Sequence, residues 1–212
     1  MDQQIDRPKV KGSGRPRSEA TRLAILDATI RLLKAASVQS ITIEAIAKQA
    51  GVSKATIYRW WPSKASVVID AFVENHLIHT PMRKDINPAE ALLLHWRALA
   101  EQYRGPPGRI IAQILAEGQS DPAILSEFRQ KFHYGRRAVV KDVVLQIQAM
   151  YRIPASIDTE FILDIFYSSI YMRLLWGHVP IDDDFVMSYP VTVFHLIGVE
   201  FDADGRAIAP KP

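Results

Sequence analysis

Cysteine is absent from the 212 residues, and long uncharged apolar runs are absent too. Without cysteine the chain has no disulfide bond, thiol nucleophile or cysteine-ligated zinc site. No uncharged apolar run reaches the roughly 18 residues that indicate a membrane-spanning helix. Residues 1–4 lack the apolar stretch that follows a basic start in a secretory signal. With 48% apolar and 23% charged residues, the composition predicts a cytoplasmic globular protein with a hydrophobic core.

The motifs of common enzymes are missing as well. The sequence has no G-x-S-x-G, no phosphate-binding glycine loop and no evident pair of nucleophile and base. His76 and His79 have a spacing that can bind a metal, but no third ligand follows at a fixed distance. Residues 182–184, three aspartates, lack the spacing of a calcium loop and are better explained as a helix cap. We therefore predict no enzyme activity, no cofactor and no metal site.

Charge is distributed unevenly along the chain. Residues 1–64 carry 12 Lys or Arg against 5 Asp or Glu, a balance of +7. The rest of the chain carries 14 against 18, a balance of −4, so the net charge of +3 hides the difference. A basic end joined to an acidic remainder indicates that the first part binds a polyanion, although a merely solvated basic surface would give the same count.

The first 64 residues predict a basic arm followed by short helices. Residues 1–17 mix Pro and Gly with Arg and Lys and show no apolar period, which is typical of a flexible arm. Apolar residues then recur every three or four positions in stretches that each follow a Ser or Thr able to cap a helix. The four expected caps are Ser18, Thr42, Ser53 and Ser63.

The remainder of the chain also follows a helical pattern, without hairpin signals or period-two alternation. Breaks rich in Pro and Gly separate expected helices at 64–79, 89–104, 109–118, 122–150, 158–177 and 182–200. Gly135 lies in the middle of the 122–150 segment, where it marks either a local break or a tolerated glycine. The sequence predicts an all-α protein with an arm (1–17), a helix-turn-helix domain (18–78), a larger helical ligand-binding and dimerisation domain (79–201) and a loose tail (202–212).

Residues 42–61 have the features of a helix-turn-helix. Ala47 is the small residue that lets two helices cross, and Gly51 tolerates the positive φ of the turn. The positions expected to face inward are Ile46, Ala50, Val52, Ile57 and Trp60. The second helix is left with a polar surface that suits the DNA major groove, because its cations neutralise phosphates and its hydroxyl and methyl groups can touch base edges. An ordinary hairpin of two helices with a Gly turn remains the alternative.

Residues 14–67 resemble the N-terminal domain of the TetR family of bacterial transcriptional regulators. The matching residues are Thr42, Ile46-Ala47, Ala50-Gly51-Val52-Ser53, Ile57-Tyr58, Trp61 and Ser63-Lys64. Two positions depart from the family pattern, since Ala65 replaces the usual Glu and Trp60-Trp61 replaces Tyr-Phe or His-Phe. Neither change removes an expected DNA contact.

The resemblance implies a homodimer whose two recognition helices enter successive major grooves of a near-palindromic DNA operator. It also implies that the C-terminal domain binds a small-molecule effector and thereby releases the DNA, most often to relieve repression. The sequence leaves open an activator, a helical adaptor and a DNA-binding protein that responds to no ligand.

The resemblance assigns DNA-binding roles to individual residues. Thr42 is expected to bind a phosphate through its hydroxyl and the first-turn amides, or to act as a simple cap. Tyr58 and Lys64 are expected to bind phosphates, with a half-buried core position as the alternative for the tyrosine. Arg15 and Arg17 either reach DNA or belong to a solvated tail. The start of the recognition helix supplies the remaining candidates, Ser53, Lys54, Ala55, Thr56 and Arg59.

The helical domain is expected to supply both the dimer interface and the effector site. The segment 158–177 is apolar nearly all round and, with 182–200, is expected to pair with its copy across a two-fold axis. Pro190 is expected to bend the second of these helices. Several aromatic and polar residues can line an effector pocket, although residues of these types are also typical of a plain hydrophobic core. They are His76, Trp96, Tyr103, Glu117, Phe128, Phe132, His133, Tyr167 and Tyr171.

Overall fold

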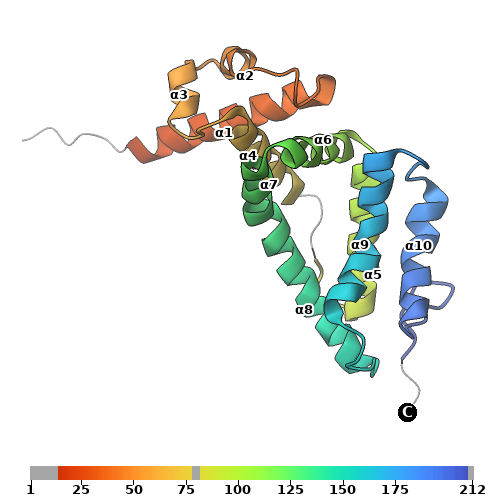
Figure 1. Cartoon of the computed structure of the whole chain (residues 1–212). Helices are drawn as coiled ribbons and strands as arrows, with labels where there is room; N and C mark the ends of the chain where they lie inside the picture. Colours follow the sequence, from red (N-terminus) through yellow and green to blue (C-terminus); the bar gives the residue numbers. More distant parts are fainter. Residues whose placement is uncertain (1–13, 78–81, 210–212) are drawn as a thin grey trace, which may run out of the picture.

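The computed structural model describes residues 14–77 and 82–209, which are helical apart from loops and one antiparallel bridge between Phe201 and Ala207 (Figure 1). The head comprises α1 (Gly14–Ala35), α2 (Ile43–Ala50), α3 (Lys54–Tyr58) and α4 (Lys64–Leu77). The body comprises α5 (Pro88–Tyr103), α6 (Pro106–Ser120), α7 (Pro122–Phe128), the π-helical turn η1 (Arg129–His133), α8 (Tyr134–Met150), α9 (Thr159–Trp176) and α10 (Asp183–Leu196). The predicted all-α fold with a helix-turn-helix head is confirmed. None of the described helices combines the length and apolarity needed to span a bilayer.

The head folds as its capping residues predict, except at its start. Thr42 Oγ1 accepts a hydrogen bond from the Ala45 amide at 3.1 Å, which caps α2. Gly51 ends α2 with φ +68°, a backbone conformation that costs a residue with a Cβ about 1 kcal/mol or more. The expectation that Ser18 caps the first helix is wrong, because α1 already begins at Gly14 and continues through this position.

The tryptophan that faces the core of the head is Trp61 and not, as expected, Trp60. Trp61 is 2% exposed, whereas Trp60 is 39% exposed. The reason is that α3 ends at Tyr58, so the following turn no longer keeps the helical spacing that predicted an inward Trp60. Ile46 and Ile57 are fully buried as expected.

Prolines begin several helices of the body. Pro88, Pro106 and Pro122 each lie in the first turn of a helix, where the missing amide hydrogen has no helical partner to lose. The break expected across residues 105–108 is therefore only the junction of α5 with α6. A Cβ on Gly108 would lie 1.9 Å from the Tyr103 carbonyl oxygen, so only glycine allows the two helices to approach this closely.

The segment 122–150 is three elements and not one helix. The π-helical turn η1 interrupts it just before Gly135, and the backbone then returns to α-helix. Phe128 and Phe132 stack with 5.1 Å between ring centroids, and both contact Phe72 of α4. The local break therefore coincides with a cluster of aromatic rings between body and head.

Pro190 lies inside α10 and is buried there.

One junction between the head and the body lies at the end of α1. Arg109 of α6 donates to the carbonyl oxygens of Leu33 and Lys34 at 3.0 and 2.8 Å. The Val38 amide donates to Gln113 Oε1, also on α6, at 2.8 Å. A cation at the last carbonyls of a helix complements the helix dipole, so α1 and α6 are expected to move together.

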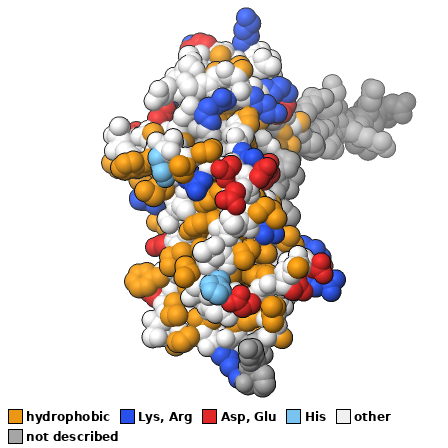
Figure 2. Space-filling model, turned by 90° about the vertical axis from the view of Figure 1, so that its right-hand side faces the viewer, with side chains coloured by type: hydrophobic (Ala, Val, Ile, Leu, Met, Phe, Trp, Pro, Cys, Tyr) orange, Lys and Arg blue, Asp and Glu red, His pale blue; other side chains and the backbone are white. Residues whose placement is uncertain are grey.

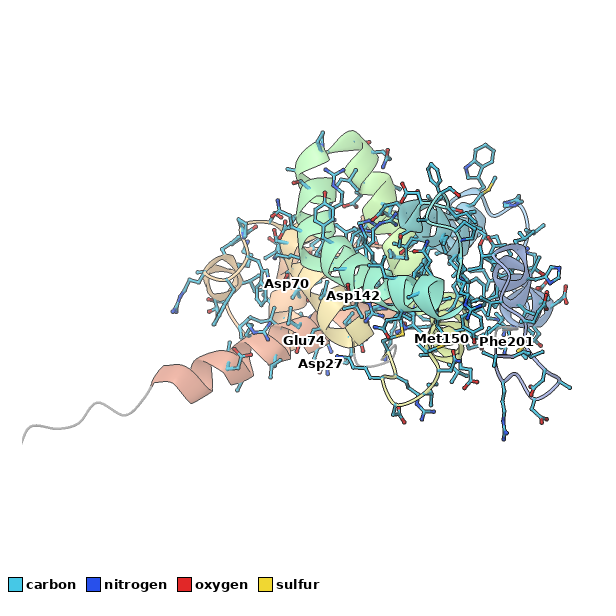
Figure 3. The ribbon with its side chains drawn as sticks, turned by 90° about the horizontal axis from the view of Figure 1, so that it is seen from below. Asp27, Asp70, Glu74, Asp142, Met150 and Phe201 are labelled. Carbon is cyan, nitrogen blue, oxygen red and sulfur yellow. The ribbon has the colours of Figure 1, made fainter. Side chains whose placement is uncertain are left out.

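A second junction links α4 to the segment around η1. The Ser66 hydroxyl donates to Glu127 Oε2 at 2.8 Å, and Lys131 Nζ lies 2.7 Å from Asp70 Oδ1 and 2.8 Å from Glu127 Oε1. Figure 3 labels Asp70, which lies where the head meets the body.

The segment expected to be a loose tail is ordered in its first part. The Asp202 amide donates to the Arg206 carbonyl at 2.9 Å, closing a turn. The Ala207 amide donates to Glu90 Oε1 of α5 at 2.9 Å, and Phe201 packs on Phe194 of α10. Figure 3 shows Phe201 at the end of the body remote from the head. A local turn, a hydrogen bond to α5 and an aromatic contact with α10 thus hold residues that the sequence pattern left without an apolar period.

Candidate DNA-binding surface and ligand cavity

The recognition helix α3 presents most of the residues predicted to touch DNA. Ser53, Lys54, Ala55, Tyr58 and Arg59 are exposed, and Thr56 is half-buried. The buried side of the helix is carried by Ile57, which lies in the core of the head. The exposed side therefore has hydroxyl, methyl, phenol and cationic groups, the types that read a major groove.

Three of these side chains already have partners within the head. Lys54 Nζ forms an exposed ion pair with Glu44 Oε1 at 2.9 Å, and this hydrogen bond lowers the pKa of Glu44. Ser53 Oγ accepts from the Thr56 amide at 3.2 Å and lies 2.9 Å from the Thr56 hydroxyl, so it caps α3. An exposed ion pair of this kind is weak and exchanges readily for a phosphate.

The structure places Lys64 in a different role from a simple phosphate ligand. Its Nζ donates to the carbonyl oxygens of Val38 and Gln39 at 2.7 and 3.2 Å, which ties the start of α4 to the loop between α1 and α2. The side chains of Arg15 and Arg17, like residues 1–13, lie outside the described part of the chain. The proposed DNA contacts of all these residues remain predictions.

A cavity of about 60 Å³ lies between α4, α5, η1, α8 and α9. Six of the predicted effector residues line it, namely His76, Tyr103, Phe132, His133, Tyr167 and Tyr171. Six further lining residues were not predicted, namely His95, Leu99, Arg136, Arg137, Val140 and Leu163. The sequence therefore identified the aromatic half of the wall and missed its cations and aliphatic residues. We call this site the aromatic cavity.

Three predicted residues do not line the aromatic cavity. Trp96 donates from Nε1 to the Phe166 carbonyl at 2.7 Å and stacks on Tyr189 of α10, so it belongs to the packed core. Phe128 is buried in the ring cluster with Phe72. Glu117 is half-buried on α6. Helical spacing alone did not separate these core positions from the cavity wall.

The polar groups of the aromatic cavity are partly or fully buried. Burial lowers the pKa of the Arg136 guanidinium and raises the pKa of the Tyr103, Tyr167 and Tyr171 phenols. Arg136 Nη2 lies 3.5 Å from His95 Nε2. Burial and the nearby cations also lower the pKa of His133. Because burial excludes water from these groups, a charge or hydrogen bond from a ligand would contribute more here than on the open surface.

Hydrophobic side chains are exposed along α9 and α10. Phe161, Ile165, Met172 and Trp176 follow one side of α9, and Trp176 is 78% exposed. Met187 and Leu196 of α10 are exposed as well. Figure 2 looks onto the side of the body that carries α10 and shows hydrophobic side chains spread over it. Such an apolar surface is typical of an interface between proteins.

The fold and the exposed recognition helix define a helix-turn-helix protein. The family model described as "Bacterial regulatory proteins, tetR family" matches residues 25–71, and "Tetracyclin repressor-like, C-terminal domain" matches residues 87–189. The HTH-type transcriptional regulator YdeS of Bacillus subtilis (strain 168) is 31% identical over 181 residues, which cover 85% of this chain and 91% of YdeS. The chain belongs to the TetR family of bacterial transcriptional regulators, and it is a DNA-binding regulator of transcription.

Solved structures share the whole fold. The TetR-family regulator SCO0332 aligns with a TM-score of 0.71 and 28% identity, over 84% of this chain and 96% of that one. The regulator FadR of Bacillus subtilis, solved in complex with stearoyl-CoA, aligns with a TM-score of 0.63 over 82% and 96% of the two chains. At 15% identity, the second likeness shows the fold alone.

Proposed function

We propose that the protein is a homodimeric repressor that leaves a near-palindromic operator when a small hydrophobic or aromatic effector binds the aromatic cavity. The observation that carries this proposal is the position of η1. Phe132 and His133 line the cavity, while the preceding residue, Lys131, reaches Asp70 of α4 in the head. A ligand that displaces the wall at η1 therefore acts on an element that contacts the DNA-binding head.

The first experiment tests sequence-specific DNA binding. The purified protein is used to select duplexes from a random library, and fluorescence anisotropy then measures affinity for the enriched duplex and for random DNA at two salt concentrations. We expect a near-palindromic site bound ~10³-fold or more tightly than random DNA, with affinity falling steeply as salt rises. Equal affinity for both duplexes would contradict the proposal and favour a helical adaptor or an architectural DNA-binding protein.

A pair of tyrosines provides a matched control for that experiment. Tyr58 on α3 is 54% exposed and Tyr134 on α8 is 55% exposed. Tyr58→Ala is expected to weaken operator binding at least about tenfold, because it removes the proposed phosphate contact and the packing of the ring on the sugar–phosphate backbone of the DNA. Tyr134→Ala should leave the affinity unchanged. A reporter gene placed under the selected operator then distinguishes repression from activation.

The proposed homodimer rests on the exposed apolar surface of α9 and α10. Burying such a surface against its copy would produce the two-fold symmetry of a palindromic operator. Ile165 on α9 and Leu145 on α8 are both 46% exposed. Ile165→Glu is expected to yield monomers in sedimentation equilibrium, whereas Leu145→Glu should remain dimeric. A wild-type protein that is monomeric at micromolar concentration would contradict this part of the proposal.

The proposed effector is small, because the aromatic cavity of about 60 Å³ is far below the several hundred Å³ of typical drug-sized sites. FadR, with the same fold, was solved in complex with stearoyl-CoA, which supports ligand binding by a protein of this fold. A ligand-induced rise in melting temperature together with release of the operator would test this step.

A further inference from the structure

The charged side chains that line the aromatic cavity are cationic. Arg136 and Arg137 line it, and the described lining residues include neither Asp nor Glu. Arg137 is directed toward α9, where it pairs with Glu160 and Asp164 at 2.6 and 2.7 Å. Arg136 also lines the cavity, with its Nη2 3.5 Å from His95 Nε2. The phenols of Tyr103, Tyr167 and Tyr171 line the same cavity.

A hydrogen-bond donor is also available beside Arg136. The hydroxyl oxygen of Tyr167 is buried and has no hydrogen-bond partner among the described residues. A buried hydroxyl without a partner carries a desolvation cost, which a ligand oxygen would remove. Burial raises the pKa of Tyr167, so the hydroxyl keeps its proton at neutral pH and can donate it in a hydrogen bond.

Part of the remaining wall is apolar, and the cavity is small. Leu99, Phe132, Val140 and Leu163 supply aliphatic and aromatic surface. An available volume of about 60 Å³ holds only a few water molecules, so a ligand with one ring or a short chain fits after small side-chain movements. The site therefore combines cationic and hydrogen-bonding groups with apolar surface.

We propose that the effector is a small monocarboxylic acid whose carboxylate binds the Arg136 guanidinium and the Tyr167 hydroxyl, with its apolar part against Phe132 and Leu163. A guanidinium binds a carboxylate through two parallel hydrogen bonds, and these strengthen in a buried site. This inference rests on the proposed function, because it names the ligand class of the cavity already assigned to the effector.

The test compares acids with neutral molecules of the same shape. Benzoate, phenylacetate and hexanoate are each paired with the corresponding primary amide, and resorcinol serves as a neutral aromatic. Binding is measured by calorimetry and by melting temperature on the full chain without DNA. At least one acid should bind about tenfold or more tightly than its amide, as expected for a charge-assisted hydrogen-bonded pair.

Variants locate the site. Arg136→Gln is expected to lower acid affinity at least about tenfold and to abolish the preference over the amide, and Tyr167→Phe should lower it about threefold to tenfold. Arg129→Gln, on the exposed side of η1, is the control and should bind as the wild type does. Operator affinity of each variant without ligand verifies that it is folded.

The outcomes separate the two proposals. Amides or resorcinol that bind as tightly as the acids, acids that do not bind, or an Arg136→Gln variant that keeps its preference would each overturn the carboxylate inference. If the operator is bound specifically in the same preparations, the regulator proposal stands without it. If acids bind as expected but no duplex is bound specifically, the inference on the ligand stands and the repressor proposal fails.

Discussion

Lys131 of the body and Asp70 of the head form an ion pair with 2.7 Å between Nζ and Oδ1. The other carboxylate oxygen of Asp70 accepts a hydrogen bond from Trp61 Nε1 at 2.7 Å. Trp61 follows the recognition helix and is buried in the head. A continuous polar path therefore runs from η1, beside the aromatic cavity, to the helix-turn-helix.

Lys131→Met should disrupt this path. The ion pair is partly shielded, with side chains 37% and 27% exposed, so its loss is expected to lower the free energy of unfolding by about 1 kcal/mol. Operator affinity should fall several-fold because α4 is no longer held against η1. Chemical denaturation and anisotropy measure the two effects. The control is Lys141→Met, which breaks a pair with Glu160 inside the body at 2.8 Å, and an equal loss of operator affinity in both variants would contradict the role of the path.

Two glycines should respond to alanine in opposite directions. Gly51→Ala forces a side chain into the left-handed conformation at φ +68°, and we expect a loss of about 1–2 kcal/mol in unfolding free energy. Gly135→Ala places a methyl group where nothing lies within 4 Å, inside α8, so a gain of about 0.5–1 kcal/mol is expected. Thermal denaturation of both variants measures the difference. Destabilisation by Gly135→Ala would show that the backbone beside η1 needs glycine for another reason.

Two lysines of the head should separate stability from DNA binding. Lys64→Ala removes the hydrogen bonds to the Val38 and Gln39 carbonyls, so it should lower both the melting temperature and operator affinity. Lys54→Ala removes only an exposed pair with Glu44, so it should weaken operator binding and leave the melting temperature unchanged within about 1 °C. If Lys64→Ala keeps the wild-type melting temperature, its hydrogen bonds to the loop contribute no stability.

His133 should make the protein less stable in mild acid. Burial is the main cause that lowers the pKa of His133 in the folded state, and the positive charges of Arg137 and Arg129 lower it further. The carboxylates of Asp164 and Glu160 oppose this shift but do not reverse it. As pH falls through about 6.5, the unfolded chain therefore takes up a proton before the folded one does, and folding stability decreases. Between pH 7.5 and 5.5 the wild type is expected to lose about 1–3 °C more in melting temperature than His133→Gln. Equal losses would assign the acid sensitivity to other groups.

The head was predicted more closely than the body because its signals are local. Thr42, Gly51 and Ser53 act on the backbone within four residues, so their types determine where α2 and α3 begin and end. The inward position predicted for Trp60 was wrong because a turn after a five-residue helix changes the side-chain direction without leaving a pattern. The start of α1 was missed because its first turn contains no apolar residue.

Most residues that line the aromatic cavity recur every four positions in the sequence, and this spacing was not used to predict them. Its walls come from three rows with a spacing of four residues, which places each row on one side of a helix. The rows are His95, Leu99 and Tyr103; Phe132, Arg136 and Val140; and Leu163, Tyr167 and Tyr171. Which rows face one another depends on tertiary packing, and that part needed the structure.

The contact between Ala207 and Glu90 joins residues 117 positions apart and has a consequence for synthesis. Ile46 and Ile57, which pack α1, α2 and α3 together, belong to the first third of the chain, so this part of the core can form once that third has left the ribosome. The hydrogen bond between Glu90, in the first turn of α5, and the Ala207 amide can form only after the last residues of the chain have been synthesised. Since domains fold as units during translation, the head is expected to be folded while the body is still incomplete. Nascent chains therefore carry a DNA-binding surface before they can carry an effector site.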